Sequence, residues 1–243
     1  MELHVVDDAR ALAVAAAARV AAVVATRPDA LLLAATGDTP IGTYNELARL
    51  ADDGTLDASR LRVAQLDEYL GLGGDDPRSL YGWMERALLA PLAIEPARII
   101  RFDVTHDDPT SAARSYDAQV RAAGGVDLAL LGLGPNGHLG FNEPPSGADA
   151  PTRKVRLNPE TLRSNADYWR DAVPERALTA GMSVILAARR ILVLVSGEGK
   201  ASILDRMLRS EPDPGLPASF LHHHADTVVL ADRDARPDRT PHA

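Results

Sequence analysis

The segment LLGLGPNGHLGFNEPP, residues 130–145, gathers side chains that could carry out acid–base chemistry. His138 and Glu143 lie close together in it, and Asn136 adds an uncharged hydrogen-bonding group. Imidazole and carboxylate groups are common general acids and bases, and one can orient the other. The segment follows an apolar run that reads as a strand. We therefore interpret it as a catalytic loop at a strand end.

The same segment has the glycine spacing of a dinucleotide-binding turn, at Gly132, Gly134 and Gly137. Such a turn should run straight into a helix and be followed, about 20 residues later, by an acidic residue that binds the ribose. Here the sequence NEPP at 142–145 interrupts any helix, and the later stretch TRKVRLNPETL is rich in basic residues. We therefore expect no dinucleotide and no other cofactor.

A second acidic group follows another apolar run, in the stretch QLDEYLGL. Asp67 stands at the expected strand end, and Glu68 is its neighbour. Adjacent residues of an extended chain point to opposite faces, so at most one of the two should enter a cleft. We choose Asp67, as a general base. The alternative is a solvated acidic pair that opens a helix.

Two further strand ends carry groups suited to a phosphate. One is the 36–39 turn, formed by Thr36, Gly37, Asp38 and Thr39, which precedes a helix expected to begin near Pro40. Free N–H groups and the helix dipole favour anions at such a helix start. The other is Lys200 in SGEGKA, where a cation opposes the dipole unless an anion lies nearby. A plain helix cap and a solvated surface lysine are the alternatives.

Apolar runs alternate with helical stretches along the whole chain. Strands are predicted at residues 30–36, 61–66, 98–102, 126–133, 190–196 and 227–231. Helices are predicted at residues 8–26, 41–52, 79–89, 109–123, 178–188 and 198–209. This alternation predicts one α/β domain over residues 1–243, with a doubly wound, mostly parallel, Rossmann-like sheet and helices on both faces. From about residue 233 the chain reads as a mobile polar tail.

Composition limits the partners. The 243 residues carry 26 basic and 34 acidic side chains, a net charge of −8, which argues against nucleic acid and anionic membranes. The start of the chain has an acidic pair where a secretory signal has basic residues, and we expect no membrane-spanning run and a cytoplasmic location. Without cysteine there is no disulfide, and three consecutive histidines at 222–224 cannot all face one ion, so we expect no metal site.

Taken in order, the motifs TGDTP, LDEYLGL, GLGPNGHLGFNEP, ALTAGM, SGEGKA and PASFL resemble those of the glucosamine-6-phosphate deaminase/isomerase family, within the group that includes 6-phosphogluconolactonases. The resemblance extends over nearly the whole chain. The tract FNEP favours the deaminase branch. A small-molecule amino sugar phosphate is therefore the expected partner, and a homo-oligomer is left open.

The resemblance implies a role for each matching residue. Asp67 would move a proton between carbons 1 and 2 of the open-chain sugar, His138 would open the ring, and Glu143 would orient His138 and stabilise its charge. The 36–39 turn and Lys200 would bind the 6-phosphate. The implied reaction is ring opening, aldose–ketose isomerisation and loss of ammonia, which converts glucosamine or galactosamine 6-phosphate to a ketohexose 6-phosphate.

Three departures from the family pattern leave alternatives open. Asn136 stands where glucosamine enzymes usually have Asp, so one carboxylate beside His138 is missing. Asp167 stands where the family has a phosphate-binding arginine, and Arg163 is one residue that could take over its role. The short tail makes activation by an amino sugar phosphate doubtful. The alternative functions are 6-phosphogluconolactone hydrolysis, which needs no carbon base, and a non-catalytic sugar-phosphate-binding regulator.

Overall fold

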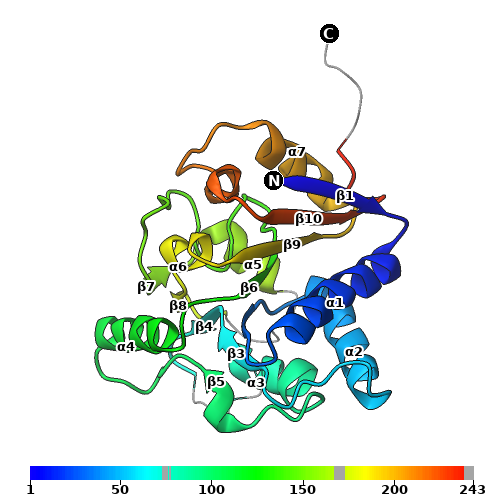
Figure 1. Cartoon of the computed structure of the whole chain (residues 1–243). Helices are drawn as coiled ribbons and strands as arrows, with labels where there is room; N and C mark the ends of the chain where they lie inside the picture. Colours follow the sequence, from blue (N-terminus) through cyan, green and yellow to red (C-terminus); the bar gives the residue numbers. More distant parts are fainter. Residues whose placement is uncertain (73–75, 77, 167–172, 238–243) are drawn as a thin grey trace.

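The computed structural model describes residues 1–72, 76, 78–166 and 173–237. A seven-stranded sheet forms its centre, and all neighbouring strands in it are parallel (Figure 1). The strand order is β1 (Glu2–Val6), β10 (Thr227–Asp232), β9 (Arg190–Val195), β6 (Leu128–Gly132), β2 (Leu31–Ala34), β3 (Arg62–Gln65) and β5 (Ile99–Ile100). The predicted α/β fold with a parallel sheet is confirmed.

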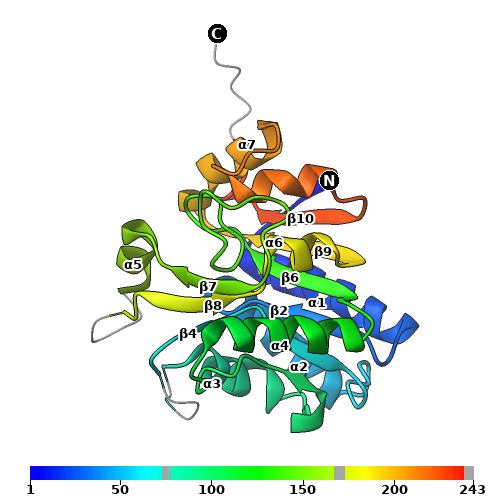
Figure 2. The ribbon, with the colours of Figure 1, turned by 90° about the vertical axis from the view of Figure 1, so that its left-hand side faces the viewer.

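Alternate side chains of the central strands enter two separate hydrophobic clusters. In β2, Leu31 and Leu33 belong to one cluster and Leu32 to the other. Successive side chains of a strand point to opposite faces, so helices must cover both faces of this sheet. One face carries α4 (Pro109–Ala122), α6 (Met182–Leu186) and α7 (Ala201–Arg209), and the other carries α1 (Ala9–Thr26), α2 (Asp38–Asp52) and α3 (Leu80–Met84) (Figure 2).

Helix α1 corrects one expectation from the sequence. It has 18 residues and a hydropathy of 1.6, so by length and composition it could cross a membrane. Its buried residues, Leu12 and Val20 among them, pack in the hydrophobic cluster between α1, α2 and the sheet. This is where the core helix of an α/β domain places its apolar side chains.

A smaller antiparallel sheet was not predicted. It contains β4 (Asp67–Tyr69), β8 (Arg176–Thr179) and β7 (Arg153–Arg156), with β8 in the middle. The predicted helix at 178–188 is therefore wrong in its first part, because α6 begins only at Met182. The apolar stretch ALTAGMSVIL suits a buried strand and a buried helix equally, so its pattern alone does not separate the two.

The order of the strands determines where a ligand site should lie. From β2 the chain proceeds to β3 and β5 on one side, and then returns to place β6 on the other side of β2. The carboxyl ends of β2 and β6 thus flank a topological switch point, where α/β folds bind ligands. Two buried tyrosines donate hydrogen bonds to the backbone at the ends of the neighbouring strands β2 and β3. Tyr44 Oη donates to Ala35 O and Tyr116 Oη to Gln65 O, each at 2.6 Å.

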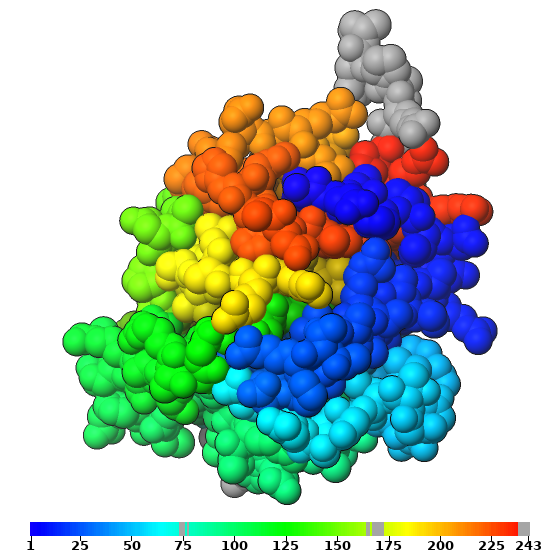
Figure 3. Space-filling view, in the orientation of Figure 1, coloured from blue at the N-terminus to red at the C-terminus, as the bar shows by residue number. Residues whose placement is uncertain are grey.

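The first strand and the last strand of the chain, β1 and β10, lie side by side at one edge of the large sheet. Strand β1 pairs with β10, and the N-terminal segment runs beside the last coloured residues (Figure 3). Part of the predicted tail packs on the domain, because Ala235 is buried and its N–H donates to Asp232 Oδ1 at 2.8 Å. The other parts of that prediction, residues 238–243, lie outside the described residues.

Candidate active site

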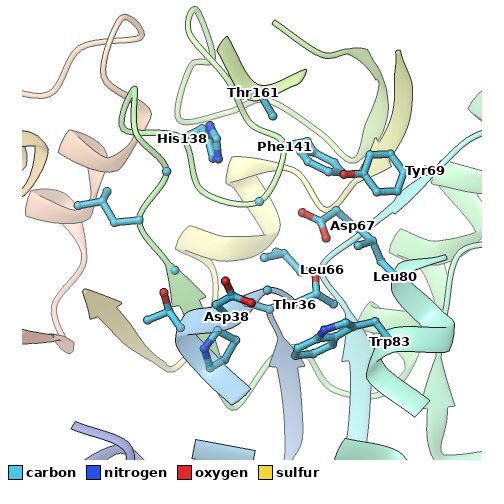
Figure 4. A pocket seen from close by; sticks show the side chains of 18 of the residues that line it. Thr36, Asp38, Leu66, Asp67, Tyr69, Leu80, Trp83, His138, Phe141 and Thr161 are labelled. Carbon is cyan, nitrogen blue, oxygen red and sulfur yellow. The ribbon is translucent and has the colours of Figure 1, made fainter. Parts of the chain in front are cut away.

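A pocket of about 440 Å³ opens at the switch point (Figure 4). Its walls come from the segments that follow β2, β3, β6 and β9, and from α3 and α5 (Pro159–Ala166). The polar residues that line it are Thr36, Asp38, Thr39, Asp67, Tyr69, Arg78, Arg86, His138, Thr161 and Lys200. Seven of the predicted site residues therefore meet in one pocket: Thr36, Gly37, Asp38, Thr39, Asp67, His138 and Lys200.

Asp67 is the acidic group of the pocket whose environment is most unusual. It begins β4 immediately beyond the large sheet, and its carboxyl points into the pocket (Figure 4). The side chain is buried, and Oδ1 has no hydrogen-bond partner among the described residues. Burial, and secondarily the charge of Glu68, raise the pKa of Asp67 to about 8. Glu68 does not line the pocket, as the alternation of an extended chain predicts.

His138 faces the same space from the loop after β6 (Figure 4). Burial, and secondarily the charge of Lys200, lower its pKa to about 4. At neutral pH the imidazole is therefore uncharged and can accept a proton. Its Nδ1 is buried and has no hydrogen-bond partner within the described part of the chain.

The glycine spacing of this loop has a packing explanation. A Cβ on Gly134 would overlap the His138 ring, and Gly137, with a φ of 83°, has the Leu216 side chain against it. Both positions therefore require a residue without a side chain. Between Leu133 and Asn158, all of them described, the chain forms no helix of the kind that a dinucleotide turn leads into. Gly134 thus makes room for the His138 ring, and Gly137 for the Leu216 side chain.

We expect Gly134→Ala to displace the His138 ring and to lower turnover about tenfold, because small misplacements of a reacting group are costly. Gly199→Ala is the matched control, since a Cβ there meets no atom within 4 Å and Gly199 does not line the pocket. Turnover of both purified variants, with thermal melts to verify folding, checks the prediction. Equal activity of the two would show that the position of His138 does not depend on Gly134.

Asn136 and Glu143 support the loop from outside the pocket lining. Asn136 Oδ1 accepts a hydrogen bond from the backbone N–H of His138 at 3.2 Å. Glu143 Oε2 accepts one from the backbone N–H of Asn158 at 2.5 Å, just before α5. Burial raises the pKa of Glu143, and the Thr161 side chain and the Asn158 N–H lower it by less.

The expected hydrogen bond between His138 and Glu143 is not formed in this structure. Nδ1 of His138 and Oε1 of Glu143 are both buried, and neither atom has a partner among the residues that the structure describes. The other carboxylate oxygen of Glu143 is taken by the Asn158 backbone N–H at the start of α5. The orienting role of Glu143 therefore stays a prediction.

Asn136→Asp should raise the pKa of His138 above about 4, because a carboxylate at this position favours the charged imidazolium. NMR titration of the His138 ring protons measures the shift. Asn136→Ala, which removes the amide without adding charge, should not produce the rise. If the two variants titrate alike, the charge at position 136 does not reach the imidazole.

The 36–39 turn and Lys200 lie on the same pocket, as the sequence predicts. Helix α2 begins at Asp38 with Gly37 as its N-cap, slightly earlier than the expected start near Pro40. The backbone N–H of Thr39 is thus in the first turn, where N–H groups have no acceptor within the helix. Lys200 Nζ donates to Leu133 O at 2.8 Å, and burial lowers its pKa.

The chain matches the model of the glucosamine-6-phosphate isomerases/6-phosphogluconolactonase family over residues 6–230. It belongs to this family. The matched range contains every residue that lines the pocket, so the resemblance read from the sequence is confirmed for the whole site region.

Individual family members give a sharper comparison. Glucosamine-6-phosphate deaminase 1 of Bacillus subtilis is 40% identical over 222 residues, which cover 90% of this chain and 92% of that protein. The Streptomyces avermitilis glucosamine-6-phosphate deaminase is 40% identical over 235 residues, or 96% of this chain and 90% of that protein. A solved structure, described as a monomeric glucosamine-6-phosphate deaminase, has a TM-score of 0.94 at 38% identity and covers 97% of this chain and 98% of its own.

The lactonase side of the family is more distant. The 6-phosphogluconolactonase of Trypanosoma brucei superposes with a TM-score of 0.75 at 22% identity, and the alignment covers 96% of this chain and 97% of that chain. At this identity the likeness shows that the fold is shared.

The sequence did not indicate every residue that lines the pocket of this protein. Among the lining residues that it missed are Tyr69, Arg78, Leu80, Trp83, Arg86, Phe141 and Thr161. Leu80, Trp83 and Arg86 recur every third residue, so they share one helical face, a periodicity that could have indicated them. Asp167 lies outside the described residues.

The histidine run has structural contacts. His222 Nε2 lies 2.9 Å from Met207 O, and His224 Nε2 lies 2.7 Å from Ala188 O. Among the described residues, no group of three side chains is arranged to hold a metal ion.

Proposed function

We propose that the protein is an amino sugar 6-phosphate deaminase/isomerase that converts glucosamine 6-phosphate and water to fructose 6-phosphate and ammonia. The observation that carries the proposal is the pairing, in one pocket, of a buried carboxyl with a raised pKa, Asp67, and an uncharged imidazole, His138. The relatives named glucosamine-6-phosphate deaminases support the choice of substrate.

Ring opening comes first. The uncharged imidazole of His138 accepts the proton of the hydroxyl on carbon 1 and returns it to the ring oxygen as the bond between that carbon and the ring oxygen breaks. An uncharged base suits this step, and the lowered pKa of His138 keeps the imidazole uncharged throughout the neutral range. The product is the open-chain aldehyde.

Isomerisation and deamination follow. Ionised Asp67 removes the proton from carbon 2 while a water molecule protonates the carbonyl oxygen on carbon 1, which gives an enolamine, and Asp67 then returns its proton to carbon 1. The nitrogen forms a double bond to carbon 2, and the hydroxide left from the water adds to that carbon. Its proton passes to the nitrogen, and ammonia leaves the ketone behind. A base with a pKa of about 8 is well matched to proton transfer at neutral to mildly alkaline pH.

A 6-phosphate would lie between the first turn of α2 and Lys200. The backbone N–H groups of that turn and the Lys200 ammonium provide donors and positive charge at one end of the pocket. Asp38 adds a negative charge there, so its side chain is not assigned to the phosphate. Arg78, whose guanidinium is paired with Asp76 at 2.8 Å, and Arg86 also line the pocket, and the sequence indicated neither.

Asp67 also separates this function from lactone hydrolysis. Opening a lactone moves no proton on carbon, so a buried carboxyl aimed at the substrate would have no task in that reaction. We further place the enzyme in the cytoplasm, without nucleic-acid or membrane partners, because charged sugar phosphates do not cross a bilayer and stay where they are made. The likeness to a monomeric deaminase favours a monomer over a homo-oligomer.

The test is one panel of substrates. The protein is incubated separately with glucosamine 6-phosphate, galactosamine 6-phosphate and 6-phosphogluconolactone, while ammonia and acid release are followed. We expect ammonia from the glucosamine substrate and acid release from the lactone at the uncatalysed rate. Catalysed acid release without ammonia would establish the lactonase, and binding without either product would establish the sugar-phosphate-binding regulator.

A further inference from the structure

Glu68 is a buried acidic residue to which the proposed reaction gives no step. Its side chain lies on the opposite side of β4 from the pocket, directly next to Asp67 in the chain. Oε1 accepts hydrogen bonds from the N–H groups of Tyr69 at 2.8 Å and Leu80 at 2.9 Å. Oε2 accepts from Gln65 Nε2 and from the N–H of Tyr81, both at 2.7 Å. All four partners are donors, which suits a carboxylate, since a carboxylic acid would need an acceptor for its own proton.

Two of these donors belong to the start of α3. Leu80 and Tyr81 are the first residues of that helix, so their N–H groups have no partner within it. Glu68 satisfies both and thereby joins α3 to β4. Leu80 and Trp83, on α3, line the pocket opposite the loop of His138 (Figure 4). The carboxylate thus connects the strand that carries Asp67 to the wall that faces it.

We propose that Glu68 is a positioning residue of the reaction: it fastens α3 to β4 and holds a buried negative charge beside Asp67, and so governs the strength of Asp67 as a base. The proposal rests on the proposed role of Asp67 in proton transfer. Glu68 acts through Asp67 and does not touch the substrate.

The electrostatic part has a definite sign. A negative charge disfavours ionisation of a neighbouring carboxyl, and Glu68 adds to burial in raising the pKa of Asp67. Two tyrosines that interact with Asp67 from either face of the sheet, Tyr44 on α2 and Tyr116 on α4, have pKa values raised by burial and stay uncharged. The other titratable or charged groups around the same pocket are Tyr69 on β4, His138 on the loop after β6, Asp38 on α2, Arg78 and Arg86 beside and beyond α3, and Lys200 after β9.

Two variants separate the effect of the negative charge of Glu68 from the effect of its hydrogen bonds to α3. Glu68→Gln removes the charge, whereas Glu68→Asp keeps the charge on a side chain that is shorter by one methylene and reaches α3 less well. The logarithm of kcat/KM is measured against pH for both and for the unaltered protein, with circular dichroism and thermal melts to verify folding. The acidic limb of this pH profile is the range in which kcat/KM rises with pH as a required base becomes ionised. In the unaltered protein it should lie near pH 8, because Asp67 must be ionised to act.

We expect Glu68→Gln to move this limb to lower pH by about one unit and to lower the rate on the alkaline plateau, since a weaker base removes the carbon-bound proton more slowly. Glu68→Asp should leave the limb in place and raise KM, because the α3 wall is displaced. If Glu68→Gln does not fold, the Glu68→Asp result decides: a limb that moves by more than about half a unit would overturn the proposal.

If Glu68→Gln folds and its acidic limb lies at the same pH as in the unaltered protein, the proposal is also overturned, whatever happens to kcat or KM. Failure of the proposed function gives a different result, because the unaltered protein would then release no ammonia or Asp67→Asn would remain active. The Glu68 proposal alone fails when the unaltered protein is active, Asp67→Asn is inactive and the limb does not respond to residue 68.

Discussion

Asp67→Asn should reduce ammonia release by two or more orders of magnitude while a substrate analogue still binds nearly normally. The amide has the same shape as the buried carboxyl but cannot accept the proton from carbon 2, and a positioned base contributes about 10²- to 10⁴-fold to such a step. Turnover is measured with glucosamine 6-phosphate, and binding with an unreactive analogue by calorimetry. Asp57→Asn, an exposed residue outside the pocket lining, is the control and should behave like the unaltered protein.

The pH dependence gives the same prediction a second readout. Because the pKa of Asp67 is raised to about 8, kcat/KM should fall as pH decreases below about 8. The residual activity of Asp67→Asn should lack this limb. Near-normal ammonia release from the variant would remove Asp67 from the mechanism.

The stability that Asp67 gives to the fold should change with pH in the opposite direction to its activity, and should fall as pH rises. An Asp whose pKa is higher in the folded state than in the unfolded chain stabilises the fold below its unfolded pKa of 3.8, and this stability is lost as pH rises to about 8. Asp67→Asn has no such loss, so its melting temperature should exceed that of the unaltered protein by an amount that grows between pH 4 and pH 8. A constant difference across that range would show that Asp67 does not titrate abnormally.

The large sheet could be predicted because its central strands are buried on both faces and read as continuous apolar runs. The strand ends then identified Asp67, His138 and Lys200, since parallel strands place their carboxyl ends at one edge. Strand β1 escaped notice because, as an edge strand, it is short and partly exposed. The small sheet escaped because its strands are only three or four residues long and β8 joins directly to the apolar stretch of α6.

The parts of the site that could not be predicted depend on contacts distant in sequence. Trp83 and Thr161 reach the pocket from helices outside the strand ends, so the rule that located the other residues does not apply to them. The direction of Glu143 is decided by the backbone N–H of Asn158, a group that no side-chain pattern reveals. The uncharged state of His138 likewise follows from burial and from Lys200, which is contributed by a different strand end.

Lys200→Ala should weaken binding of the phosphorylated substrate by about 10- to 100-fold, since a charge-assisted contact to phosphate contributes roughly 1.5–3 kcal/mol. The loss should be much smaller for unphosphorylated glucosamine. KM for both sugars, or their Kd with Asp67→Asn as the background, gives the comparison. The chain offers a matched control in its other lysine, Lys154, which is exposed on β7 and outside the pocket lining.

The same substitution should also change His138, because Lys200 contributes to lowering the pKa of the imidazole. Removal of the ammonium charge should raise that pKa, as measured by NMR titration, and Lys154→Ala should not alter it. If Lys200→Ala raises the pKa of His138 and weakens binding of the phosphorylated sugar alone, Lys200 lies between the phosphate and the imidazole. Equal losses for both sugars would instead mean that Lys200 supports the loop through its bond to Leu133 O and does not recognise the phosphate.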